Sequence, residues 1–185
     1  RTVPDTLKIR AYVEQNKPKS AAVIGGGYIG MEMAENLKHA GLDVTVVEMA
    51  EHIIAPLDLD MASLVQHYAR ENGIRLILKN GVQAFIPTES HIEVQLSHGT
   101  LNANLVLMSV GVKPETSIAQ KAGISCNTRG AILVDEHMRT SIPDIYAVGD
   151  AISVTNFVTK QEAYIPLAGP ANKQGRIAAD HICGR

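Results

Sequence analysis

The sequence Val23-Ile24-Gly25-Gly26-Gly27-Tyr28-Ile29-Gly30 follows a short apolar run and leads directly into an amphipathic segment. Its glycines at positions 25, 27 and 30 have the spacing Gly-x-Gly-x-x-Gly, which joins a strand to a helix in dinucleotide-binding domains. We expect Gly25 to permit a tight turn, and Gly27, which has no side chain, to leave room for a pyrophosphate. Gly30 would let the helix lie close to the strand, with its free N–H groups directed at the phosphates.

Glu48 ends the next expected strand, residues 44–47, about 20 residues beyond the glycine turn. A carboxylate at this position accepts hydrogen bonds from the adenosine ribose hydroxyls, so the sequence predicts an adenine dinucleotide site. Residues 49–52, Met-Ala-Glu-His, include no arginine or lysine to meet a 2′-phosphate, which favours NADH over NADPH. A lysine or arginine distant in sequence could still reach that phosphate.

The composition indicates a small-molecule partner rather than a polyanion. The 185 residues include 17 Lys and Arg against 19 Asp and Glu, a formal net charge of −2, with no block of one sign. This balance gives no electrostatic case for nucleic acid or an anionic membrane. No apolar run approaches the ~20 residues that span a bilayer, and no leader precedes the first expected helix, so we expect a cytoplasmic protein.

The cysteines and histidines do not have the spacing of a metal site. Cys126 and Cys183 are far apart and form no Cys-x-x-Cys pair, and the seven histidines show no His-Glu-x-x-His pattern. We therefore predict no metal ion, and two buried or free structural thiols.

Strand and helix signals alternate between residues 21 and 78, which predicts a three-layer α/β fold with a parallel sheet and right-handed crossovers. Strands are expected at residues 21–24, 44–47 and 74–78. Helices are expected from Asp5 or Thr6 to just before Pro18, over residues 28–40, and from Asp58 or Asp60 to Gly73.

The third expected helix carries an apolar stripe at the spacing i, i+3, i+4, i+7, i+8. The members of this stripe are Met61, Leu64, Val65, Tyr68 and Ala69. We expect this side of the helix to cover the sheet.

The period changes after residue 81. Ile92, Val94 and Leu96 alternate with polar residues, so residues 82–103 are expected to form a small antiparallel meander inserted into the parallel fold. Residues 105–110 are apolar at nearly every position and should return to the parallel sheet as a strand buried on both faces. The remaining expected elements are a short helix over 117–122, strands at 132–134 and 145–148, and a last helix that follows Pro170 and runs towards Ile182.

The stretch Thr140-Ser141-Ile142-Pro143-Asp144-Ile145-Tyr146-Ala147-Val148-Gly149-Asp150 resembles the flavin-binding signature of FAD-dependent pyridine nucleotide-disulphide oxidoreductases. The chemistry fits FAD, because Gly149 leaves room for a ligand and the Asp150 carboxylate can accept hydrogen bonds from a ribityl chain. The alternative interpretation is a Gly-Asp turn after a buried strand.

Two further stretches resemble the nicotinamide site of this family. In Gly27-Tyr28-Ile29-Gly30-Met31-Glu32, the resemblance implies that Tyr28 shields the flavin until the nicotinamide displaces it, that Glu32 contacts the carboxamide, and that Ile29 is part of the NAD-binding turn. Ser109-Val110-Gly111-Val112-Lys113-Pro114 resembles the turn beside the bound dinucleotide, which implies an NAD contact at Gly111. The alternatives are an aromatic residue packed on the sheet, an acid favoured by the helix dipole, and a plain strand-ending turn.

The segment Tyr164-Ile165-Pro166-Leu167-Ala168-Gly169-Pro170-Ala171-Asn172-Lys173-Gln174-Gly175-Arg176-Ile177 closely resembles the coenzyme A-disulphide reductase and NADH-dependent persulphide reductase branch. In that branch, which includes forms fused to a rhodanese domain, the start of this helix lies against the flavin ring. The resemblance therefore implies FAD contacts at Pro166, Leu167 and Ala168. N–H groups at a helix start would stabilise the negative charge of a reduced flavin. Alternatively, the proline marks an ordinary helix start.

The resemblance covers the whole chain but only part of the family's architecture. The family's N-terminal flavin-binding section, with its redox cysteine, and its C-terminal dimerisation domain have no counterpart in this sequence. We expect an NAD(H)-binding domain over residues 1–135 and the C-terminal strip of an FAD-binding domain over residues 136–185. Neither Cys126 nor Cys183 matches the redox-cysteine motif, so the catalytic cysteine is expected outside this chain, in an enzyme that forms a homodimer.

The resemblance implies an enzyme that passes hydride from NADH to FAD and then electrons to a coenzyme A disulphide or persulphide. NADH oxidases, NADH peroxidases and reductases of small redox proteins share these motifs, and they stay open as alternatives. An alternative of another class is a non-catalytic module that senses NADH or flavin through a change of conformation.

Overall fold

The computed structural model describes residues 2–185 and divides into two compact units at Gly111 and Val112. We call residues up to 111 the N-terminal unit and residues 112–185 the C-terminal unit. The division falls earlier than the domain boundary expected after residue 135. The physical reason is a shared core, because Ile124 and Ile132 are buried in one cluster with Ile152 and Ala178.

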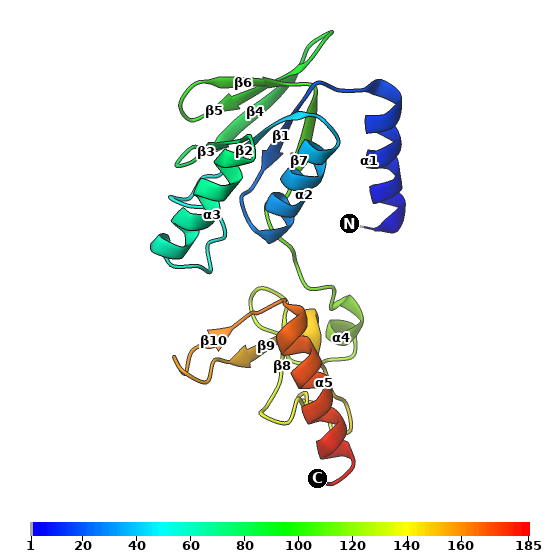
Figure 1. The fold of residues 1–185 in the computed structure, drawn as a ribbon. Coiled ribbons are helices and arrows are strands. Elements are labelled where there is room, and N and C mark those ends of the chain that lie inside the picture. The colour runs from blue at the N-terminus through cyan, green and yellow to red at the C-terminus, as the bar shows by residue number, and fades with distance from the viewer. Residues whose placement is uncertain (1) are drawn as a thin grey trace. The chain divides into compact units, whose positions relative to one another are not determined.

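A four-stranded parallel sheet forms the centre of the N-terminal unit, in the order β3-β2-β1-β7 (Figure 1). The strands are β1 (Ser20–Ile24), β2 (Asp43–Val47), β3 (Ile74–Ile77) and β7 (Leu105–Met108). The crossovers are α2 (Tyr28–His39) between β1 and β2, and α3 (Leu59–Glu71) between β2 and β3. The alternation of strand and helix seen in the sequence therefore gave the correct sheet, with all its pairs parallel.

Side chains alternate between the two faces of this sheet and build a layer on each. On one face, Val23 and Val46 pack with Ala34 and Leu37 of α2. On the other face, Ala22 and Ile24 pack with a second sheet. That antiparallel sheet consists of β4 (Val82–Pro87), β5 (Ile92–Leu96) and β6 (Thr100–Ala103). The expected three-layer α/β fold with an antiparallel meander is confirmed.

The face of α3 that covers the sheet is not the one expected. Ala62, Gln66 and Ala69 are buried, whereas the side chains of Met61, Leu64 and Tyr68 are 53%, 64% and 67% exposed. Two sets of residues at helical spacing overlap in this segment, and the set with the alanines lets the helix approach the sheet closely. The prediction that Met61, Leu64 and Tyr68 face the sheet is therefore wrong.

The expected full burial of residues 105–110 is also wrong. The strand ends at Met108, its first three residues are half-buried, and Val110 is 68% exposed. The reason is the sheet order, because β7 lies at an edge and pairs with β1 on one side only. The order of strands in a sheet depends on the whole fold and cannot be predicted from the residues of one strand.

The ends of the first and last helices differ from the expected positions. Helix α1 (Val3–Asn16) begins before Asp5, because the Thr2 side chain accepts from the Asp5 N–H and the Asp5 carboxylate accepts from the Thr2 N–H. Helix α5 (Ala168–Ile182) begins two residues before Pro170. Pro170 therefore lies in the first turn of the helix, where proline is tolerated.

The C-terminal unit contains several short elements, most of which share one core cluster with α5. They are α4 (Ser117–Lys121), β8 (Ile132–Leu133), the 3-10 turn η1 (Gly149–Ala151), β9 (Ile152–Thr155) and β10 (Glu162–Ala163). Strands β9 and β10 were not predicted. Residues 145–148, expected as a strand, form a single bridge between Arg139 and Tyr146 rather than a ladder.

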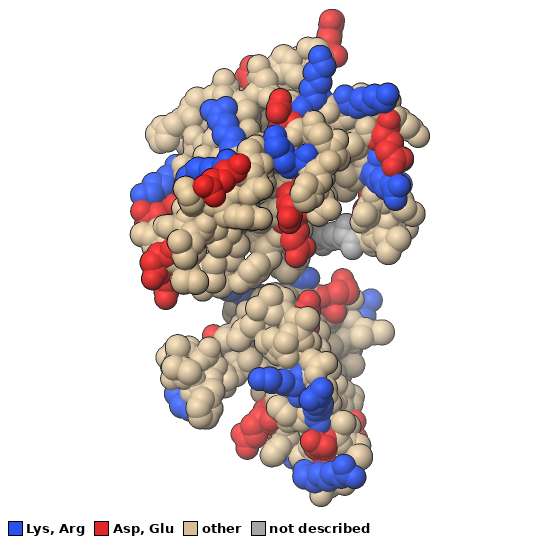
Figure 2. Space-filling model, viewed as in Figure 1, with Lys and Arg blue, Asp and Glu red and all other residues tan. Residues whose placement is uncertain are grey.

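Two observations concern the surface of the chain. On the face shown in Figure 2, Lys and Arg are interspersed with Asp and Glu. Within residues 2–185, the structure contains no helix with the length and apolar character needed to cross a membrane.

Candidate functional site

The glycine turn links β1 to α2, and two of its glycines have no space for a side chain. Gly25 has a φ of +103°, and a Cβ there would overlap the carbonyl oxygen of Ser109. A Cβ at Gly30 would overlap the carbonyl oxygen of Gly25. These two glycines are therefore required by the path of the backbone, as the sequence pattern predicted for a turn that packs a helix onto a strand.

Gly27 differs from its neighbours, because the space beside it is open. Within residues 2–185, and apart from Gly27 and its two neighbours in the chain, no atom lies within 4 Å of the position that a Cβ at Gly27 would occupy, and the residue is exposed. Gly27 is the N-cap of α2, with ordinary extended dihedrals and no side-chain cap among the described residues. A helix start with uncapped N–H groups beside open space has the geometry of a phosphate-binding turn.

Glu48 holds the end of β2 against the glycine turn. Its Oε2 accepts a hydrogen bond of 2.6 Å from the Gly26 N–H, and its Oε1 accepts one of 2.8 Å from the Ala50 N–H. The side chain is half-buried, and both oxygens are fixed in position. Because an ionised carboxylate has about four acceptor sites, each oxygen keeps a lone pair for a ribose hydroxyl.

The loop after β2 is fastened to the same turn by residues that the sequence analysis did not single out. The Ile54 N–H donates to the Gly26 carbonyl over 2.8 Å, with Ile54 at a φ of +51°. Ile53 is fully buried, and a Cβ at Gly26 would lie 2.8 Å from its Cγ2 atom. A β-branched residue rarely adopts the left-handed conformation, and it does so only where surrounding contacts compensate for the strain. The hydrogen bond of Ile54 and the burial of Ile53 therefore hold this loop in place. No local sequence signal marked it.

Tyr28 and Glu32 lie one turn apart on α2 and both line a cavity of about 320 Å³ between α2 and α3. Tyr28 is 42% exposed and Ile29 is 52% exposed. Gly111 follows the end of β7 with a φ of +104° and is exposed. The Ser109 N–H donates to the Ile24 carbonyl, which places the end of β7 beside the glycine turn. The glycine turn, Glu48 and Gly111 thus lie at the carboxyl end of the parallel sheet, whereas Glu32 lies one turn further along α2.

The residues predicted to contact FAD gather at the start of α5. The Gly149 N–H donates to Oε1 of Gln174, a buried residue of α5, over 2.8 Å. The Tyr164 hydroxyl donates to the Asp150 carbonyl over 3.0 Å, and burial, followed by the charge of Asp150, raises the pKa of this hydroxyl. Sequence reasoning missed Gln174, which ties the Gly-Asp turn to the helix.

The predicted residues 166–168 form the first part of the same helix start. Leu167 is the N-cap of α5, and Ala168 is its first helical residue. Pro166 is half-buried, whereas Leu167, Ala168 and the side chain of Asp150 are exposed. The Gly-Asp turn and an uncapped helix N-terminus are therefore neighbours within the C-terminal unit, an arrangement suited to a polar ligand with negative charge.

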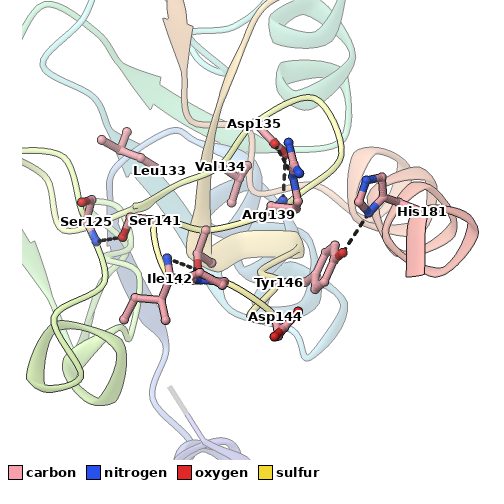
Figure 3. A pocket seen from close by; sticks show the side chains of 12 residues that line it. Ser125, Leu133, Val134, Asp135, Arg139, Ser141, Ile142, Asp144, Tyr146 and His181 are labelled. Atoms are coloured by element: carbon pink, nitrogen blue, oxygen red, sulfur yellow. Dashed lines mark hydrogen bonds and ion pairs between the residues drawn. The ribbon is translucent and has the colours of Figure 1, made fainter. Parts of the chain in front are cut away.

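A larger cavity of about 670 Å³ lies elsewhere in the C-terminal unit (Figure 3). Its wall includes Tyr146, whose hydroxyl is 2.8 Å from Nδ1 of His181, and the ion pair of Arg139 with Asp135, 2.6 Å apart. Residues 149–150 and 166–168 are not part of its lining. The size of this cavity is not by itself evidence for a functional role.

The two cysteines are free thiols, Cys126 half-buried and Cys183 exposed. Across residues 2–185, no group of three or more His, Cys, Asp or Glu side chains is arranged to hold a metal ion.

Comparison with known proteins gives a family match over most of the chain. The family model described as pyridine nucleotide-disulphide oxidoreductase matches residues 1–175. An NADH oxidase of Methanocaldococcus jannaschii is 40% identical over 185 residues, which are 100% of this chain and 41% of that protein. The chain therefore spans less than half the length of this relative.

Two solved structures share the fold at high similarity. The reduced CoADR-RHD of Bacillus anthracis has a TM-score of 0.91 and 45% identity, with 100% of this chain and 33% of that chain covered. The NAD-dependent persulfide reductase of A. fulgidus has a TM-score of 0.90 and 36% identity, with 100% and 34% covered.

Proposed function

Because this chain belongs to the pyridine nucleotide-disulphide oxidoreductase family, whose members are NAD(P)H-dependent oxidoreductases, we propose that its N-terminal unit binds NADH. The C-terminal unit would supply part of an FAD site. The enzyme that includes both would pass hydride from NADH to FAD, and then electrons to a coenzyme A disulphide or persulphide through a cysteine outside this chain.

The observation that carries the NADH proposal is the fixed Glu48 carboxylate beside an open Gly27. Glu48 is held by the Gly26 and Ala50 N–H groups, so its free lone pairs have a defined direction. Gly27 leaves the start of α2 accessible to a pyrophosphate. One end of the dinucleotide would bind the carboxylate and its centre would bind the helix start. Tyr28 and Glu32, on the same helix, would face the nicotinamide end.

The residues of the C-terminal unit fit FAD in charge and hydrogen bonding. When bound, this cofactor accepts a hydride and gains negative charge on its ring. The N–H groups of residues 168 and 169 at the start of α5 would stabilise that charge. Asp150 would accept hydrogen bonds from the ribityl hydroxyls, and Gln174 would hold the Gly149 turn in place.

The coenzyme A acceptor is supported by the segment 164–177 and by the similarity to a persulfide reductase. The longer enzyme would be a cytoplasmic homodimer with a small-molecule substrate. An NADH oxidase is a second candidate, because the Methanocaldococcus relative at 40% identity has that name.

We predict that this chain alone does not reduce a coenzyme A disulphide. Reduction requires a thiol next to the flavin, and Cys126 and Cys183 lie outside the proposed FAD residues. The chain would be incubated with NADH, FAD and coenzyme A disulphide, and released thiol measured with a chromogenic disulphide. Thiol release that depends on NADH, exceeds one equivalent per cysteine and is absent from a Cys126→Ser, Cys183→Ser control would contradict the assignment of the redox cysteine to another part of the enzyme.

Calorimetric titration of the chain with NADH, and in parallel with NADPH, tests the proposed cofactor. We expect saturable binding of NADH at one site per chain, with NADPH binding more weakly. Absence of NADH binding, with the fold intact by circular dichroism, would contradict the proposal. A preference for NADPH would contradict the role given to Glu48.

A further inference from the structure

Lys79 reaches the loop after β2 although it is distant from that loop in sequence. It follows β3, and its backbone N–H donates to the Ala50 carbonyl over 2.9 Å. Its Nζ atom lies 2.6 Å from Oε1 of Glu51. Lys79 has a φ of +53°, so its backbone is held in a conformation that a lysine rarely adopts.

A short chain of hydrogen bonds connects Lys79 to the carboxylate that is proposed to bind the ribose. Ala50 accepts from the Lys79 N–H through its carbonyl and donates to Glu48 Oε1 through its own N–H. The next residue, Asn80, donates its N–H to the Glu48 carbonyl over 3.1 Å. Backbone hydrogen bonds therefore connect the segments that follow β2 and β3, and the Lys79 ammonium group lies beside the loop that follows Glu48.

Glu51 currently neutralises that ammonium group. Both side chains are accessible, 67% for Lys79 and 58% for Glu51. The hydrogen bond from Lys79, and then its charge, lower the pKa of the Glu51 carboxyl, so this acid is ionised at neutral pH. A phosphate that approached this loop would have to compete with Glu51 for Lys79.

We infer that Lys79 is a latent ligand for the 2′-phosphate of NADPH and that Glu51 withholds it, so that two acids rather than one set the preference for NADH. This inference rests on the proposed NADH site. The 2′-phosphate replaces a ribose hydroxyl that Glu48 would bind, and its charge is repelled by both carboxylates. A lysine ammonium is a suitable partner for phosphate once its own counter-ion is removed.

The test is the substitution Glu51→Gln, alone and combined with Lys79→Met, in the 185-residue chain. Calorimetry at low ionic strength would give the ratio of NADPH to NADH affinity for each protein. Glu51→Gln should raise this ratio about two- to fivefold, the range expected for an exposed ion pair. Adding Lys79→Met should abolish the gain, because methionine is unbranched and only one atom shorter than lysine but has no charge.

A matched control is Asp43→Asn, at the opposite end of β2. Asp43 lies 3.9 Å from Lys38, so this substitution removes the same charge from a looser ion pair at the other end of the strand from Glu48. It should leave the ratio unchanged. The proposed role of Lys79 would be overturned if the NADPH to NADH affinity ratio rose equally in Asp43→Asn or did not rise in Glu51→Gln. It would also be overturned if the rise persisted in the variant that carries both Glu51→Gln and Lys79→Met. These outcomes leave the NADH site itself unaffected. Failure of the unsubstituted chain to bind NADH would overturn the NADH site and, with it, this inference.

Discussion

Gly27→Ala should weaken NADH binding by at least about tenfold while changing the free energy of unfolding by less than about 1 kcal/mol, because the poorer N-cap is offset by the lower entropy of the unfolded chain. The backbone at Gly27 has a φ of −72° and open space around it, so alanine fits without strain. The added methyl group would nevertheless stand beside the first N–H groups of α2, where the pyrophosphate is proposed to lie. Calorimetry and denaturant unfolding would measure the two effects separately.

Gly25→Ala is the contrasting variant. A Cβ at Gly25 would overlap the Ser109 carbonyl, and the φ of +103° is unfavourable for alanine. We expect a loss of about 2 kcal/mol or more in the free energy of unfolding. If Gly27→Ala destabilised the fold as much as Gly25→Ala, or bound NADH as tightly as the unsubstituted chain, the open space at Gly27 would not be a pyrophosphate site.

Glu48→Arg should reverse the cofactor preference, with NADH affinity lowered at least about tenfold and NADPH affinity raised. The substitution removes the acceptor for the ribose hydroxyls and adds a cation that suits a phosphate. It also removes the acceptor of the buried Gly26 N–H, so stability should fall by about 1–3 kcal/mol. Titration with both nucleotides below the unfolding temperature separates affinity from stability.

Glu48→Gln is the matched variant for that measurement. Its amide oxygen can still accept from Gly26, whereas its NH₂ group cannot accept from Ala50, so only one of the two hydrogen bonds is lost. We expect a weaker fall in NADH affinity, and a smaller gain in NADPH affinity than in Glu48→Arg, because one repelling charge is removed but no cation is added. An unchanged preference in Glu48→Arg would remove Glu48 from the ribose role.

The features that the sequence predicted well are those encoded by adjacent residues. The turn at residues 25–30 and the start of α2 follow from glycine spacing and helical periodicity, and both were found where expected. Glu48 also follows from its place after an apolar strand, and the structure places its carboxylate against the glycine turn. Local sequence patterns were therefore sufficient to predict the glycine turn, the start of α2 and the position of Glu48 at one end of the sheet.

The features that the sequence did not predict depend on contacts between distant segments. Met61 and Leu64 were assigned to the wrong face, because a second set of residues that includes two alanines packs on the sheet instead. Lys79 lies outside residues 49–52, where the sequence analysis looked for a cation. Only the pairing of β2 with β3 brings it to the loop that follows Glu48. Gln174 was missed for the same reason, because its role depends on how α5 packs against the Gly149 turn.

The most direct test of the account is an amide chemical-shift titration of the 185-residue chain with NADH. The central claim predicts the largest shifts at the N–H groups of Gly26, Gly27 and Ala50, which surround the glycine turn and the Glu48 carboxylate. It also predicts that Gly27→Ala strongly reduces these shifts at an NADH concentration close to the dissociation constant of the unsubstituted chain. Saturable shifts confined to the C-terminal unit, with these three amides unmoved, would contradict the claim that this turn binds the dinucleotide.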